Sequence, residues 1–192
     1  AARAVFDEMI AAGEKPNVFV ASSIASRLET IEQATELRDV LRAESRAGTT
    51  FYQAAFARLC RQYAARPILN WALGDGKGLP FQAFDAAIST YRRRGDLDSA
   101  FLIAAGFPYL EASRTVFRAF GEQARAYLEA RFEGGVEPHI AARALGVVFA
   151  YAKDTDESLR WFDIALRHEM TPPARVAVIQ AEIDRVRLSE FA

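Results

Sequence analysis

The sequence predicts an all-α protein, an α-solenoid of about ten or eleven helices in antiparallel pairs. Apolar residues recur at helical spacing along most of the chain, and no segment shows the sustained alternation that is typical of strands. Residues at one end of the chain also recur at the other end with the same intervals. Ala124, Leu128, Gly135, Pro138, His139 and Ile140 match Ala2, Phe6, Gly13, Pro16, Asn17 and Val18, in that order. A repeated helix pair is the simplest cause of such a match.

The first half of the chain predicts four helices and ends in a strong break. The apolar stripes indicate helices over 2–12, from Pro16 to about residue 28, from Thr30 to about residue 41, and over 51–63. Pro67–Leu73 is expected to form a short turn of helix at most. The segment 74–80 contains three glycines and a proline. We therefore expect a single helical-repeat domain over 1–192, with a candidate sub-boundary at the loop 74–80.

The second half predicts seven more helices, each bounded by glycine or proline. These helices are expected over 81–93, 97–105, 108–120, 123–132, 138–152, 155–168 and 173–188. Gly95-Asp96 and Gly134-Gly135 mark helix ends, whereas Pro108, Pro138 and Pro172-Pro173 mark helix starts. Thr155, with Glu157 and Ser158, is expected to cap the helix that follows. The two clearest helices of the chain are those over 138–152 and 155–168.

Composition and charge exclude several function classes. The 24 Lys and Arg residues nearly balance the 25 Asp and Glu residues, so no global basic charge indicates a nucleic-acid partner. No apolar run approaches the ~20 residues that span a bilayer, which predicts no membrane insertion. Two histidines and one cysteine give no zinc-binding pattern. Because no nucleophile, base or phosphate-loop grouping is present either, we predict a protein that is not an enzyme and has no cofactor.

Arginine, cysteine and tryptophan residues each have a structural and a functional interpretation. Arg92, Arg93 and Arg94 could bind phosphate, but cations at a helix C-terminus before a glycine cap favour a structural role. The excess of 21 arginines over 3 lysines has the same two interpretations. Cys60 is expected to be a small buried thiol. Trp71 and Trp161 are expected to be core or interface anchors.

The helix pair over 138–168 resembles a tetratricopeptide repeat. Leu145-Gly146, Phe149, Ser158, Phe162 and Ala165 fall at the signature offsets of that motif. Its packing logic is that small residues at Gly146 and Ala165 let the helices approach, while the two phenylalanines fill the angle between them. Phe84, Ala87, Tyr91, Gly95 and Ala100 repeat part of this pattern. This resemblance implies an adaptor that holds a peptide or a partner protein without nucleic acid, in a cytoplasmic setting.

The opening of the chain instead resembles a pentatricopeptide repeat, through Ala2, Phe6, Met9, Gly13 and Pro16-Asn17-Val18. In that family, residues near the start of each first helix contact RNA bases. The resemblance implies Asn17, Ser22, His139 and Arg143 as the nearest equivalents. It also implies a non-catalytic scaffold in a mitochondrial (organellar) ribonucleoprotein, such as a ribosome or an RNA-processing complex.

The spacing between the two ends of the chain is irregular, whereas a code that reads one base per repeat needs constant geometry. We therefore expect degenerate repeats that mainly bind other protein subunits, with RNA contact as a further expectation. The chain opens on what the resemblance makes a second helix. This phase predicts a piece of, or a subunit in, a larger assembly.

Overall fold

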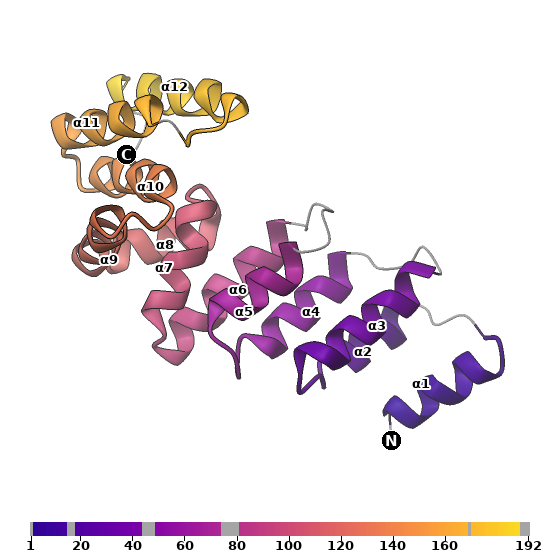
Figure 1. Cartoon of the computed structure of the whole chain (residues 1–192). Coiled ribbons are helices and arrows are strands. Elements are labelled where there is room, and N and C mark those ends of the chain that lie inside the picture. Colours follow the sequence, from indigo (N-terminus) through magenta and orange to yellow (C-terminus); the bar gives the residue numbers. More distant parts are fainter. Residues whose placement is uncertain (1, 15–17, 44–48, 74–80, 169, 189–192) are drawn as a thin grey trace. The chain divides into compact units, whose positions relative to one another are not determined.

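The computed structural model describes residues 2–14, 18–43, 49–73, 81–168 and 170–188, and within these ranges the protein is entirely helical, without a strand (Figure 1). The predicted all-α class is therefore confirmed. The described ranges hold twelve helices. They are α1 (Ala2–Ala11), α2 (Val18–Ala25), α3 (Ile31–Ala43), α4 (Thr49–Leu59), α5 (Ala65–Leu73), α6 (Phe81–Arg94), α7 (Leu97–Gly106), α8 (Glu111–Ala119), α9 (Gly121–Glu133), α10 (Pro138–Tyr151), α11 (Thr155–Arg167) and α12 (Pro173–Arg187). In none of them does an apolar stretch reach the length needed to cross a membrane.

The helix count exceeds the prediction by one because α5 is a helix of 9 residues, not a short turn. Pro67 is only the third residue of α5, and a proline in the first turn of a helix removes no hydrogen bond that the helix needs. The N-terminal amide of α5 finds its acceptor far away in the sequence, since the Ser99 hydroxyl accepts a hydrogen bond from Ala65 N at 3.0 Å. A local pattern cannot reveal that cap.

The chain forms two compact units, residues 1–99 and 100–192. The predicted sub-boundary at 74–80 lies outside the described residues. In the first unit, α2, α4 and α6 pack side by side, while α3 contacts α2 and α5 (Figure 1). Helices that are two apart in the sequence are thus spatial neighbours, an arrangement typical of stacked helix pairs.

Aromatic side chains fill the core of the first unit. Phe56 of α4 lies at the centre, with its ring centroid 5.8 Å from that of Phe84 and 6.0 Å from that of Trp71. Trp71 also donates a hydrogen bond from Nε1 to the Thr35 hydroxyl at 3.0 Å. The prediction that Trp71 is a core anchor is confirmed, because α3, α4 and α5 all pack around it.

In the second unit, α10 is the central helix. It packs against α8, α9 and α11, and every residue from 141 to 150 is buried. The predicted close approach of α10 and α11 at Gly146 is confirmed, because a Cβ atom on this residue would lie 2.7 Å from the Phe162 ring. The Ser158 hydroxyl donates a hydrogen bond to the Gly146 carbonyl at 2.8 Å. Trp161 is buried as predicted, with its ring edge-on to that of Phe132.

The turns of the helix pairs α6–α7 and α10–α11 have the same hydrogen bonds. Asp96 N donates to the Tyr91 carbonyl at 3.1 Å, and Asp154 N donates to the Phe149 carbonyl at 3.0 Å. Each aspartate then caps the next helix, because its carboxylate accepts a backbone N–H three residues later at 3.2 Å. The predicted cap at Thr155 is therefore wrong by one residue, since Asp154 performs it.

The ends of α1 and α9 also agree in their backbone. Gly13 and Gly135 have φ values of 73° and 67°. Glu14 N and Val136 N donate to the carbonyls of Met9 and Arg131, both at 2.9 Å. These bonds and the left-handed glycine are the signature of a Schellman cap. The sequence repeat between 2–18 and 124–140 is thus matched by a repeated helix end in the backbone.

One predicted helix start is wrong. Pro108 was expected to open a helix, but α8 begins at Glu111. Pro108 and Tyr109 are instead the central residues of a turn in which Leu110 N donates to the Phe107 carbonyl at 3.2 Å. Proline suits the first central position of such a turn as well as it suits a helix start, so the residue alone does not decide between them.

The substitution Gly146→Ala is expected to lower the free energy of unfolding by about 1–3 kcal/mol, because the new methyl group overlaps the Phe162 ring. Urea denaturation monitored by circular dichroism measures the change. Gly106→Ala is the matched control, since a Cβ atom there has no heavy atom within 4 Å. Equal effects of the two substitutions would show that the contact with Phe162 does not set the spacing of α10 and α11.

Candidate functional site

The structure does not gather the predicted contact residues into one site. Asn17 lies outside the described residues. Ser22 and Arg92–Arg94 belong to the first unit, whereas His139 and Arg143 belong to the second. Ser22 is half-buried on α2, and its buried hydroxyl oxygen has no hydrogen-bond partner within the described part of the chain. The predicted contact residues therefore have separate surroundings.

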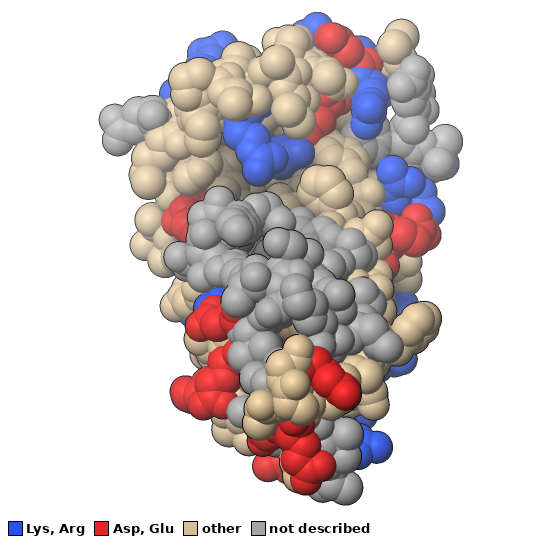
Figure 2. Space-filling view, turned by 90° about the vertical axis from the view of Figure 1, so that its right-hand side faces the viewer, with Lys and Arg blue, Asp and Glu red and all other residues tan. Residues whose placement is uncertain are grey.

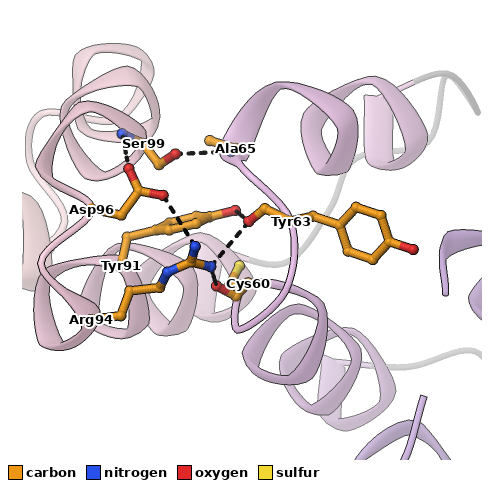
Figure 3. A network of polar contacts seen from close by, with 7 residues as sticks. All are labelled: Cys60, Tyr63, Ala65, Tyr91, Arg94, Asp96 and Ser99. Carbon is orange, nitrogen blue, oxygen red and sulfur yellow. Dashed lines mark hydrogen bonds and ion pairs between the residues drawn. The ribbon is translucent and has the colours of Figure 1, made fainter. Parts of the chain in front are cut away.

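Arg94 joins the end of α6 to the end of α4 (Figure 3). Its Nη1 donates to the Cys60 carbonyl at 2.5 Å and approaches the Tyr63 carbonyl at 3.4 Å, while Nη2 lies 3.7 Å from an Asp96 carboxylate oxygen. The Tyr91 hydroxyl donates to the same Tyr63 carbonyl at 3.0 Å. The guanidinium thus serves backbone carbonyls of the turn that follows α4.

The same network holds Cys60 in an unreactive state. The thiol is fully buried, and burial raises its pKa to about 12. Burial also raises the pKa of the neighbouring Tyr91 hydroxyl. At neutral pH both groups carry their protons, so neither can act as a nucleophile or a base. The prediction of a small buried thiol is confirmed.

Arg58 repeats the role of Arg94 two helices earlier in the chain. It lies in the last turn of α4, and its Nε donates to the Leu28 carbonyl, just beyond α2, at 2.8 Å. Arg58 was not among the predicted contact residues. Its place in the last turn of a helix, which it shares with Arg94, was the signal in the sequence.

The other two arginines of the predicted cluster differ in exposure. Arg93 is exposed and bonds within its own helix, to the Ser89 carbonyl at 3.2 Å and the Thr90 hydroxyl at 3.4 Å. Arg92 is half-buried. Arg93 and Arg94 are both exposed, but Arg94 is also held by the carbonyls and the carboxylate described above.

Arg143 forms a buried ion pair with Glu182 of α12. Its Nε lies 2.9 and 3.1 Å from the two carboxylate oxygens, and Nη2 donates to Oε1 as well. Arg143 is 7% exposed and Glu182 is 2% exposed. The Arg143 guanidinium also lies over the Tyr109 ring, 5.6 Å from its centroid. Burial, followed by the nearby Glu182 carboxylate, raises the pKa of Tyr109. This arginine therefore ties α10 to α12 and presents little of its surface to a base.

His139 and His168 lie close together at the start of α10 and the end of α11. Their ring centroids are 6.0 Å apart. His139 Nδ1 is buried and has no partner among the described residues. Burial and the second histidine both lower the pKa of His139, and Arg175 adds to this effect against the opposing Glu137 carboxylate. His139 is therefore neutral at pH 7.

Carboxylates dominate the exposed surface of α3. Glu32, Glu36 and Asp39 are exposed and follow one another at spacings of four and three residues, which places them on one helix face. Glu29 precedes them just before the helix. In the view of Figure 2, acidic side chains gather in the lower part of the molecule, at the level where Figure 1 shows α1 to α3. The pKa of Glu32 is lowered by its backbone N–H and by the Thr30 hydroxyl.

Apolar side chains are exposed on α12 and next to it. Val176, Val178 and Leu188 are 41%, 39% and 68% exposed. Ile179, Ile183 and Val186, by contrast, are buried. The helix therefore has apolar residues on more than the face that it packs against α11.

Breaking the buried ion pair is expected to destabilise the second unit. Arg143→Met leaves the Glu182 carboxylate buried without its cation and should lower the free energy of unfolding by about 3–5 kcal/mol. The double variant with Glu182→Leu should recover most of that loss. Arg167→Gln, which removes an exposed pair with Asp163, should cost less than about 1 kcal/mol. Urea denaturation decides, and a double variant no more stable than Arg143→Met would contradict this account.

The lowered pKa of His139 predicts a stability that falls with acid. The unfolded state binds a proton near the ordinary histidine pKa while the folded state resists it, so stability is lost as pH falls below about 6.5. The free energy of unfolding should decrease from about pH 7.5 to about pH 5.5, and His139→Asn should flatten that slope. Denaturant titrations across this range measure it. A slope identical in the variant would show that His139 is not the group responsible.

A search of protein-family models and of curated proteins found no match to this chain.

Proposed function

We propose that this chain is a non-catalytic helical-repeat scaffold whose ligand is a partner protein. The observation that carries the proposal is that three of its arginines form their bonds within the chain. Arg58 and Arg94 are hydrogen-bonded to backbone carbonyls, and Arg143 is paired with a buried carboxylate. Cations held in this way have few donors left for phosphate groups.

The exposed surfaces support the same proposal. The carboxylates of α3 repel a phosphate backbone, whose neutralisation by Lys and Arg provides most of the affinity of nucleic-acid binding proteins. Exposed valines and a leucine on and beside α12 suit the apolar core of a protein interface. Of the two functions that the resemblances imply, the protein–protein adaptor has the better support. RNA contact and a mitochondrial ribonucleoprotein setting stay predictions that rest on the pentatricopeptide resemblance.

Fluorescence anisotropy with labelled single-stranded RNA tests the proposal directly. We expect no saturable binding at about 50 mM salt, where phosphate contacts are strongest. A selection of random peptides displayed on phage should, in parallel, enrich a defined sequence pattern on the folded chain. RNA binding that weakens with salt and with Arg93→Gln would contradict the proposal. So would a selection that enriches no pattern.

A further inference from the structure

The second unit contains a cleft of about 400 Å³ where the end of α8, the start of α9 and the end of α10 meet. This volume is at the lower end of the range for ligand pockets. Apolar side chains of Phe117, Val148 and Phe149 form part of the lining, and all three are at most 8% exposed. The cleft therefore has a rigid apolar base built from core residues.

Two arginines line the cleft, each over an aromatic ring of α10. The guanidinium carbon of Arg118 lies 5.0 Å from the centroid of Tyr151, and that of Arg125 lies 5.8 Å from the centroid of Phe149. The attraction between a cation and an aromatic face holds each guanidinium in place before any ligand arrives, which lowers the entropy lost on binding.

The two arginines differ in their carboxylate partners. Arg125 lies 2.9 Å from a Glu122 oxygen and 3.9 Å from a Glu129 oxygen. Arg118 is exposed and has no ion pair within the described residues. Burial raises the pKa of the Tyr151 hydroxyl, and the charges of Arg114 and Arg118 oppose this rise. Arg118 is therefore the cation that an incoming anion would meet beside the apolar base.

We propose that this cleft binds an acidic side chain of a partner protein, with an adjacent aromatic or aliphatic side chain of that partner on its apolar base. The inference rests on the proposed protein-binding function and names the chemistry of the partner segment. Charge complementarity with Arg118 selects the carboxylate, whose planar geometry matches a guanidinium edge. The buried phenylalanines and Val148 select the apolar neighbour. A run of phosphates is disfavoured, because Glu122 also lines the cleft and pairs with Arg125, which leaves Arg118 as the one described lining cation without a carboxylate partner.

Isothermal titration calorimetry with the full chain tests this assignment. The probe is a short peptide with glutamate, phenylalanine and aspartate at its centre, blocked at both ends, and its control has glutamine and asparagine in place of the acids. The acidic peptide should bind, and Arg118→Gln should weaken it at least about tenfold. The matched variant Arg160→Gln should leave the affinity unchanged, because Arg160 also lies over an aromatic ring, that of Trp161, but does not line the cleft.

Each outcome separates the cleft from the broader function. Equal binding of the acidic and amide peptides, an affinity unchanged by Arg118→Gln, or no binding of the acidic peptide would overturn the cleft assignment. In these cases a peptide pattern selected on phage would still support the scaffold. Binding of labelled RNA that Arg118→Gln abolishes, without peptide binding, would overturn both proposals. The thermal unfolding temperature of Arg118→Gln must match that of the wild type. An Arg118→Lys variant keeps the charge, so loss of peptide binding in this variant would show that the planar guanidinium is needed and not the charge alone.

Discussion

Backbone carbonyl groups in the turns after α2 and α4 are the constraint on which the first unit depends. These carbonyls lie beyond the helices, and a buried carbonyl without a donor is costly. Arg58 and Arg94 meet this need by reaching from the last turn of one helix to the turn after the helix packed beside it, at the carbonyls of Leu28 and Cys60. Because an arginine carries its guanidinium at the end of a long apolar stem, it can satisfy distant carbonyls and cover apolar surface at the same time. These arginine–carbonyl hydrogen bonds therefore join each helix to the turn after its neighbour.

This constraint also shapes what the surface can bind. An arginine that ties two helices together has lost most of its donors, so a high arginine content does not by itself indicate a nucleic-acid ligand. The described surface also offers carboxylates on α3, valines on α12, and a cleft in which Arg118 lies over the Tyr151 ring. Surfaces of such varied character suit several different protein contacts more than one continuous polymer of phosphates.

Local features of the fold could be predicted from the sequence, and contacts between distant residues could not. Helical periodicity located eleven of the helices, and the approach of α10 to α11 followed from Gly146 and Phe162, because small and large residues report packing directly. The helix α5 was underestimated because its N-terminal amide is capped by Ser99, which local patterns do not reveal. The partner of Arg143 was missed for a similar reason, since Glu182 lies 39 residues further along the chain. The cleft was not predicted, because its lining residues come from three helices and are brought together only by the packing of those helices.

The turn after α10 has a backbone conformation that its residues do not indicate. At the corresponding turn after α6, Gly95 has a φ of 78°, whereas Lys153 adopts a φ of 61° in its place. A lysine in this left-handed region is strained relative to glycine, but the bonds on either side of it hold the turn closed. The two turns thus share a positive φ although one has glycine and the other lysine, so at this position a comparison of backbone geometry detects a similarity that a comparison of residues misses.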